Sequence, residues 1–124
     1  MRRTIVFKNG RKLWPVFRAE TFLQKARGLM FKRKAFPLLF EFDSEAIASN
    51  AIHSFFCPVF DAVFLDSRKR VVCVFKRVAP SQPFLQPSKP AKFLLELPPG
   101  EARKLRVGEK LSWNPGEPGR WKKA

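Results

Sequence analysis

Hydrophobic residues recur along this chain in short runs, and most of these runs predict β-strands. Two of them, between Thr4 and Ala19, flank the dipeptide Asn9-Gly10. Asn-Gly readily adopts the positive φ angles of a tight type I′ turn, so this pattern predicts a β-hairpin. Pro15 lacks a backbone N–H, which places the second strand at a sheet edge or beside a bulge.

A helical pattern replaces the strand pattern over residues 21–28. Thr21 and Gln24 have the spacing of a capping box, in which each side chain bonds the backbone N–H of the other residue. Gly28 tolerates the positive φ that often ends a helix. The sequence therefore predicts one short α-helix directly after the hairpin.

The chain after this helix returns to strands, and its central hairpin is apolar on both faces. Strands are expected over residues 37–42, 51–57, 61–65, 71–78, 93–97 and 110–113. If Leu65 lies opposite Arg70, each face of this hairpin can be listed. One face consists of Phe60, Ala62, Phe64, Val71, Cys73 and Phe75. The other face consists of Asp61, Val63, Leu65, Val72 and Val74. Strands of this kind are buried on both sides, as in a barrel or a sandwich with an added layer.

These elements define an expected fold class and a domain organisation. The fold class is all-β, mainly an antiparallel barrel or sandwich, with one short α-helix after the first hairpin and a single helical turn near the C-terminus. We expect one domain over residues 1–113 and a flexible basic tail over residues 114–124. A five-stranded oligonucleotide-binding barrel is compatible with this length, although a fold analogy would not establish a function.

Positive charge is the strongest compositional feature, because the chain has 25 Lys and Arg against 10 Asp and Glu, a formal charge of +15. The charge is unevenly distributed. Residues 35–66 contain no Lys or Arg and five carboxylates, whereas the segments on both sides are strongly basic. A protein with this field attracts polyanions, either nucleic acid or anionic lipid headgroups.

Cysteine and histidine are too few for a zinc site, since the chain has only Cys57, Cys73 and His53. We therefore expect no metal and no cofactor. Neither a signal peptide nor an apolar run of about 20 residues is present, so we expect no membrane span and a cytoplasmic protein with reduced thiols.

His53, Cys57 and Asp61 are the candidate chemical groups. Residues 53 and 57 of one strand lie about 13 Å apart, whereas a thiol and its base must lie within hydrogen-bond reach. An inert buried thiol is therefore favoured over a nucleophile. Asp61 lies on an apolar face, so it either accepts structural hydrogen bonds from backbone N–H groups or an Arg, or anchors a ligand on the floor of an apolar pocket.

The order of several short motifs resembles the family named domain of unknown function 192. The motifs are Gly28-Leu29-Met30, the strand from Asp61 to Asp66, the segment Leu95-Glu96-Leu97-Pro98-Pro99-Gly100, and the turn Val107-Gly108-Glu109-Lys110. The resemblance covers roughly residues 4–113 and implies a fold without an established activity. This chain has Phe56-Cys57 where relatives often have Trp-Met or Phe-Met.

Two function classes follow, and a third is remote. The first is a non-enzymatic module that binds RNA or DNA, or another polyanion, in a salt-dependent, non-specific way through Arg2, Arg3, Lys8, Arg11, Lys12, Arg68, Lys69, Arg70, Lys76, Arg77, Arg103, Lys104 and Arg106. The second is a ligand-binding or accessory domain with an apolar pocket at His53, Phe55, Phe56, Cys57 and Asp61. The remote alternative is an unidentified hydrolase. The sequence assigns no catalytic residue and leaves the oligomeric state open.

Overall fold

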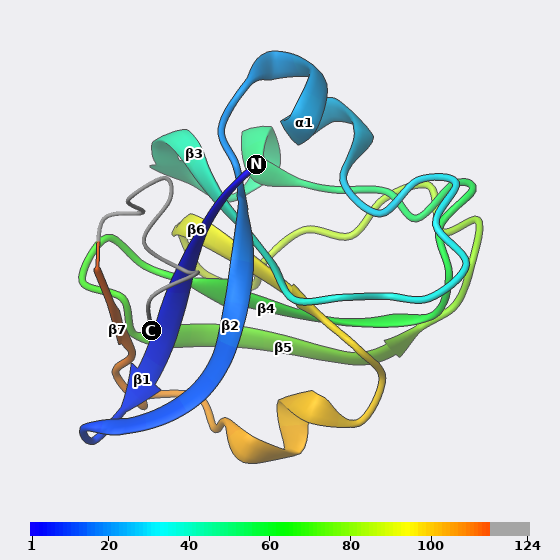
Figure 1. Ribbon diagram of the computed structural model, residues 1–124. Helices are drawn as coiled ribbons and strands as arrows, with labels where there is room; N and C mark the ends of the chain where they lie inside the picture. The colour runs from blue at the N-terminus through cyan, green and yellow to red at the C-terminus, as the bar shows by residue number, and fades with distance from the viewer. Residues whose placement is uncertain (115–124) are drawn as a thin grey trace.

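The computed structural model describes residues 1–114, which form one seven-stranded sheet with a short helix beside it (Figure 1). The order of strands in the sheet is β5-β4-β6-β3-β2-β1-β7, and only β2 and β3 pair in parallel. The elements are β1 (Arg2–Lys8), β2 (Arg11–Ala19), α1 (Phe22–Arg27), β3 (Leu38–Ala46), η1 (Ala48–Asn50), β4 (Phe60–Leu65), β5 (Val71–Val78), β6 (Ala91–Leu97), η2 (Glu101–Lys104) and β7 (Ser112–Trp113). The expected all-β fold class, with its short helix and helical turn, is confirmed.

The sheet bends into a sandwich-like fold but does not close as a barrel. Its two end strands are β5 and β7, and an isolated bridge between Arg70 and Lys110 connects the chain near them. The backbone N–H of Val71 also donates to the carbonyl of Glu109 at 2.8 Å. The chain that leads into β7 therefore covers the start of β5.

Two hydrophobic cores pack on opposite faces of the central strands, as the sequence predicted. Alternate residues of β4 and β6, such as Val63 and Leu95, join the tryptophans Trp14 and Trp113 in the first core. The apolar residues on the opposite face join the second core, which contains Ala19, Leu29, Leu38, Phe40, Cys57, Phe60, Ala62, Phe64, Val78, Ala91 and Leu94. Every residue of β4 is buried, which explains why all of them except Asp61 are apolar.

The predicted register of the central hairpin is wrong at its turn. Leu65 pairs with Val71, and Phe64 pairs with Cys73, with an irregularity between these two pairs. A bulge of this kind sets two residues of one strand against one of the other. As a result Val71 faces the first core and Val72 the second, the reverse of the expected arrangement.

In the first 30 residues the structure contains the turn and the helix cap that the sequence predicts. Asn9 and Gly10 have φ of 52° and 75° in the hairpin turn. The capping box of α1 is present, because Gln24 N donates to Thr21 Oγ1 and Thr21 N donates to Gln24 Oε1. Pro15 precedes the three residues of β2 that pair with β3, so its missing N–H interrupts no bond to that strand.

The strand predicted over residues 51–57 is not formed. This segment follows η1 as a loop that touches the proline-rich loop 79–90 through a bridge between Ile52 and Leu85. Ser54 is fully buried there, donating to the carbonyl of Ala79 and accepting from the N–H of Gln82. A partner segment with several prolines lacks the donors for a continuous ladder, so a side chain takes over part of the pairing.

Within residues 1–114 no helix is long and apolar enough to cross a membrane. The tail expected over residues 114–124 lies, from residue 115 onward, outside the described residues.

Candidate functional site

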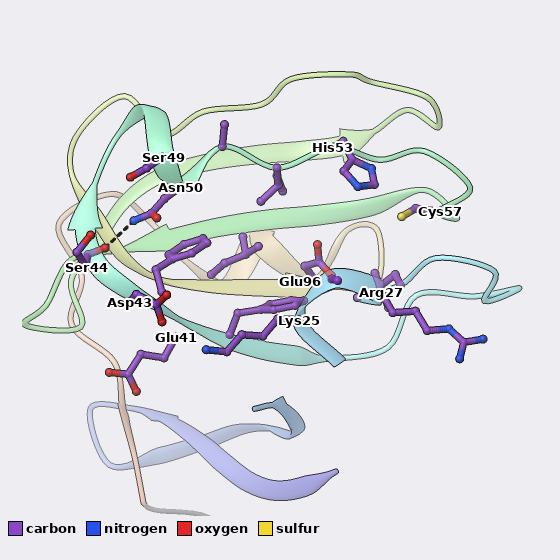
Figure 2. A pocket seen from close by; sticks show the side chains of 18 residues that line it. Lys25, Arg27, Glu41, Asp43, Ser44, Ser49, Asn50, His53, Cys57 and Glu96 are labelled. Carbon is purple, nitrogen blue, oxygen red and sulfur yellow. Dashed lines mark hydrogen bonds between the residues drawn. The ribbon is translucent and has the colours of Figure 1, made fainter. Parts of the chain in front are cut away.

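A pocket of about 480 Å³ lies between α1, β3, the segment after η1, and β6 (Figure 2). Apolar side chains supply much of its wall, including Leu29, Phe40, Ile52 and Leu94. The volume falls within the range of about 300–1,000 Å³ that is typical of small-molecule sites. The pocket therefore has the size and the apolar wall of a ligand site.

The most unusual group in this pocket is the carboxyl of Glu96. Glu96 is the penultimate residue of β6, with Leu38 of β3 on one side and Ala62 of β4 on the other. Its side chain points into the pocket, and the residue is only 5% exposed (Figure 2). Oε1 is buried and has no hydrogen-bond partner among the described residues. Burial raises the pKa of Glu96 to about 8, so the neutral acid predominates at pH 7.

Gly28, which ends α1, allows the chain to pass close to this carboxyl. Its φ is 50°, and a Cβ at this position would lie 3.4 Å from Glu96 Oε1 and 3.3 Å from Phe40 Cζ. The distance to Phe40 is tighter than most Cβ contacts, and the distance to Oε1 is that of a van der Waals contact. The glycine therefore satisfies both a positive φ and a close approach to β6.

Cys57 and His53 also line the pocket, but their geometry does not favour nucleophilic catalysis. Burial, followed by the charge of Glu96, raises the pKa of the Cys57 thiol to about 11. The nucleophilic thiolate is therefore a minor species at neutral pH. His53 Nδ1 accepts the N–H of Phe55 at 3.1 Å, so the ring is engaged with its own loop.

The rim of the pocket carries charges of both signs. Lys25 and Arg27 lie on the α1 side, and Glu41 and Asp43 on the β3 side (Figure 2). At the same end Asn50 is buried and donates from Nδ2 to the carbonyls of Ser44 and Ala91, both at 2.8 Å. This amide fixes the end of β3 against the start of β6, and it makes that end of the pocket polar.

Asp61 is not among the residues that line the pocket. Its Oδ1 accepts the N–H of Arg77 at 2.8 Å, and its Oδ2 accepts those of Gly100 and Ala102, both at 2.9 Å. The residue is completely buried. Asp61 therefore connects β4 to β5 and to the turn that holds η2, which is the structural alternative that the sequence left open.

Phe55 and Phe56 also lie outside the pocket wall, and they are 40% and 66% exposed. Of the five residues expected to form a pocket, the structure thus brings only His53 and Cys57 together around one. Sequence reasoning missed Glu96 as a pocket group. A detectable signal was present, because a carboxylate interrupts the otherwise apolar strand Phe93-Leu94-Leu95-Glu96-Leu97.

The basic residues lie on several elements, and some of them gather where β1 approaches η2. Lys8 Nζ lies 3.3 Å from Glu109 and also donates to the carbonyl of Lys104. Lys104 and Arg103 both contact Glu101, at 2.9 and 3.1 Å. The other predicted cations are on the first hairpin, at the 68–70 turn and at the end of β5, except Arg106, which follows η2. Lys69 in the 68–70 turn lies over the Trp113 ring.

Potential metal ligands do not gather in the described part of the chain, where no three His, Cys, Asp or Glu side chains form a group that could hold an ion.

Fold and pocket together define a small all-β domain with a ligand-sized pocket between its helix and one face of its sheet. The chain belongs to the DUF192 family, described as Uncharacterized ACR, whose model matches residues 4–113. The family resemblance read from the sequence is thereby confirmed.

Relatives with no assigned activity share most of this chain. It is 34% identical over 99 residues to UPF0127 protein PF1050 of Pyrococcus furiosus, covering 77% of this chain and 84% of that protein. It is 38% identical over 103 residues to UPF0127 protein TK1120 of Thermococcus kodakarensis, covering 80% of this chain and 64% of that protein. A crystal structure of a protein of unknown function from Novosphingobium aromaticivorans has a TM-score of 0.76 at 20% identity, covering 90% of this chain and 84% of that one. This last likeness shows the fold alone.

Proposed function

We propose that this protein is a non-enzymatic binding domain that holds a small amphipathic molecule in the pocket at Glu96. The single observation that carries this proposal is the buried Oε1 of Glu96, which lacks a partner among the described residues inside a pocket of about 480 Å³. A ligand that places a polar head at this oxygen and an apolar body along the pocket wall would satisfy both features.

An unsatisfied polar group at this position has an energetic cost. A buried acceptor without a hydrogen bond costs about 1–3 kcal/mol, and that cost falls on the ligand-free protein. The cost is recovered when a ligand supplies the missing hydrogen bond. Gly28 also supports the proposal, because a side chain at this position would crowd Phe40 and occupy the space next to Oε1.

A series of octyl compounds tests this proposal by varying only the polar head of the ligand. Octanol, octylamine and octanoate share one apolar body and differ in the head that would meet Glu96. Each would be titrated into ¹⁵N-labelled protein, and the amide shifts of Gly28, Leu29 and Cys57 would be followed. We expect at least one compound to shift these signals saturably.

Matched variants assign that binding to the carboxyl group. Glu96→Leu replaces the anchor by an apolar side chain and should weaken the binding of the preferred octyl compound about tenfold. Glu45→Gln, an exposed change at a residue that does not line the pocket, should leave binding unchanged. The proposal fails if no compound shifts the pocket signals, or if wild type and Glu96→Leu bind the preferred compound equally.

We propose, as a second function, a non-specific contact with nucleic acid through the basic surface. The observation that favours it is the approach of Lys8 on β1 to Lys104 on η2, which joins cations that are far apart in the sequence. In β1 and β2, moreover, Arg2 lies opposite Arg18 and Lys8 opposite Arg11. Cations placed opposite each other across a hairpin add to the local positive field, which attracts a polyanion. Arg2 and Lys8 also contact Glu20 and Glu109, at 3.6 and 3.3 Å.

Fluorescence anisotropy across a salt series tests this second function. Nuclease-treated protein would be titrated into labelled single-stranded RNA and duplex DNA. Log affinity should fall by several units per log unit of salt if several phosphates are neutralised. Absence of binding even at low salt would show that the charge has another origin.

A further inference from the structure

Two phenylalanines form a stacked pair on the surface beside the pocket. Phe31 follows the Gly28-Leu29-Met30 segment and Phe56 lies in the loop before β4, and each is 66% exposed. Their ring centroids are 5.3 Å apart and their planes differ by 20°. The N–H of Phe31 donates to the carbonyl of Phe56 at 2.8 Å, so the backbone holds the two loops together.

The backbone of both residues is in an unfavourable region. Phe31 has φ of 64° and Phe56 has φ of 60°, which bulky side chains rarely adopt. Neither ring is buried in the core, so core packing does not offset this strain. Strained backbone that holds exposed aromatic rings side by side is typical of functional surfaces.

Positive charge surrounds this pair. Lys32, Arg33 and Lys34 follow Phe31 directly and are all exposed, as is Arg27 before it. The sequence has no Asp or Glu between residues 21 and 40. A second ring pair is adjacent in the chain, because His53 and Phe55 lie 5.4 Å apart between centroids. The surface therefore combines flat aromatic faces with a segment of chain whose charged residues are all cations.

We propose that Phe31 and Phe56 form a stacking platform for the bases of single-stranded nucleic acid, with Lys32, Arg33 and Lys34 binding its phosphates. This inference rests on the second proposed function and specifies where unpaired bases would lie. Aromatic faces stack on any base, while a basic groove follows the backbone. Two near-parallel rings present flat outer faces on which a base can stack. Aromatic side chains that insert into a lipid surface need no such alignment.

The experiment compares labelled dT₁₂ with a duplex of equal length, using the double variant Phe31→Ala/Phe56→Ala. Loss of base stacking should weaken dT₁₂ binding at least about fivefold. Binding of the duplex should stay unchanged, because its bases are already stacked on one another. Phe84→Ala is the matched control, since Phe84 is 59% exposed in the loop before β6.

A charge comparison tests the second half of the proposal. Replacing Lys32, Arg33 and Lys34 by Gln should lower the steepness of the salt dependence for dT₁₂ by about 0.7 per lost phosphate contact. The same substitutions at the exposed Lys12, Arg68 and Lys89 remove equal charge elsewhere and should lower it less.

Three outcomes would overturn the platform. If the double Phe variant binds dT₁₂ as wild type does, the platform is wrong while the non-specific function survives. If wild type binds neither oligonucleotide, both are wrong. If the double variant loses only its co-sedimentation with vesicles of phosphatidylserine and phosphatidylcholine, the rings contact a lipid surface instead.

Discussion

Gly28 lies directly against the buried carboxyl of Glu96, so that a methyl group on the glycine would be 3.4 Å from Oε1. These residues are 68 positions apart, and both lie within the part of the chain that the family model matches. Their meeting places the end of α1 on the central strand β6. One contact thus connects the helix, the sheet and the pocket.

Substitution of Gly28 should show this close approach directly. Gly28→Ala adds a methyl group at φ of 50° and pushes it against Phe40 and Glu96, so we expect a loss of roughly 1–2 kcal/mol in the free energy of unfolding. Gly10→Ala is the control, because Gly10 also has positive φ but has no atom within 4 Å of the added methyl. Urea unfolding of both variants measures the difference. Equal losses would mean that the contact with β6 contributes nothing.

The raised pKa of Glu96 predicts a dependence of stability on pH. The pKa of this carboxyl is about 8 in the folded chain, against an ordinary value of 4.5 for a solvated glutamate. Between these values the unfolded chain releases the proton and the folded chain retains it. The contribution of Glu96 to the free energy of unfolding should therefore fall by roughly 1.4 kcal/mol per pH unit as pH rises from 4.5 to 8, and stay constant above.

Glu96→Gln cannot ionise, so its contribution to this slope should vanish between pH 4.5 and 8. Asp43→Asn removes an exposed acid from the same pocket and should keep the wild-type slope. Urea unfolding at several pH values compares the three proteins. Parallel curves for wild type and Glu96→Gln would contradict the raised pKa.

Asp61→Asn should destabilise the fold strongly. The side chain accepts three backbone N–H groups while completely buried. An amide has one acceptor oxygen and directs its own N–H groups toward those donors, so we expect a loss of about 3 kcal/mol. Asp66→Asn is matched, since Asp66 accepts two N–H groups in a partly exposed turn where Asn is well tolerated. An unchanged melting temperature for Asp61→Asn would rule out the structural role.

Cys57 should react slowly with iodoacetamide. Burial and Glu96 raise the pKa of its thiol to about 11, and the residue is only 8% exposed. In a Cys73→Ser variant the rate should increase about tenfold per pH unit between about pH 8 and 10 without levelling off. Cys57→Ser retains the more exposed Cys73 and should label faster. Mass spectrometry follows both rates, and a plateau near about pH 9 for Cys57 would refute the prediction.

The pocket could be predicted from the sequence only in part. His53 and Cys57 were recognised because polar groups stand out in an apolar run, and both line the pocket. Asp61 stood out for the same reason, yet it bonds backbone groups of β5 and η2 instead. A one-dimensional pattern shows that an acid is buried, but its partners come from segments up to 41 residues away.

The loop over residues 51–57 likewise depends on residues that are distant in the sequence. Its apolar composition predicted a strand, but a strand needs a partner with free donors and acceptors along its length. The segment that it meets contains Pro80, Pro83 and Pro87. The backbone pairing is therefore limited to the bridge between Ile52 and Leu85 and to hydrogen bonds of Ser54 with Ser81 and Gln82. Residue propensities predicted a strand at residues 51–57, which is wrong, because the proline-rich segment beside them determines their conformation.

By itself the sequence determined the features that depend on nearby residues: the Asn9-Gly10 hairpin, the capped helix α1, the strands β4 and β5, the all-β class and the net charge. Side-chain periodicity and turn chemistry act within a few residues, so they can be read from the chain. Only the tertiary structure decided the bulge after Phe64, the pairing of Phe31 with Phe56, and the approach of Gly28 to Glu96. These features arise where distant segments compete for the same space and hydrogen bonds, and no local pattern records that competition.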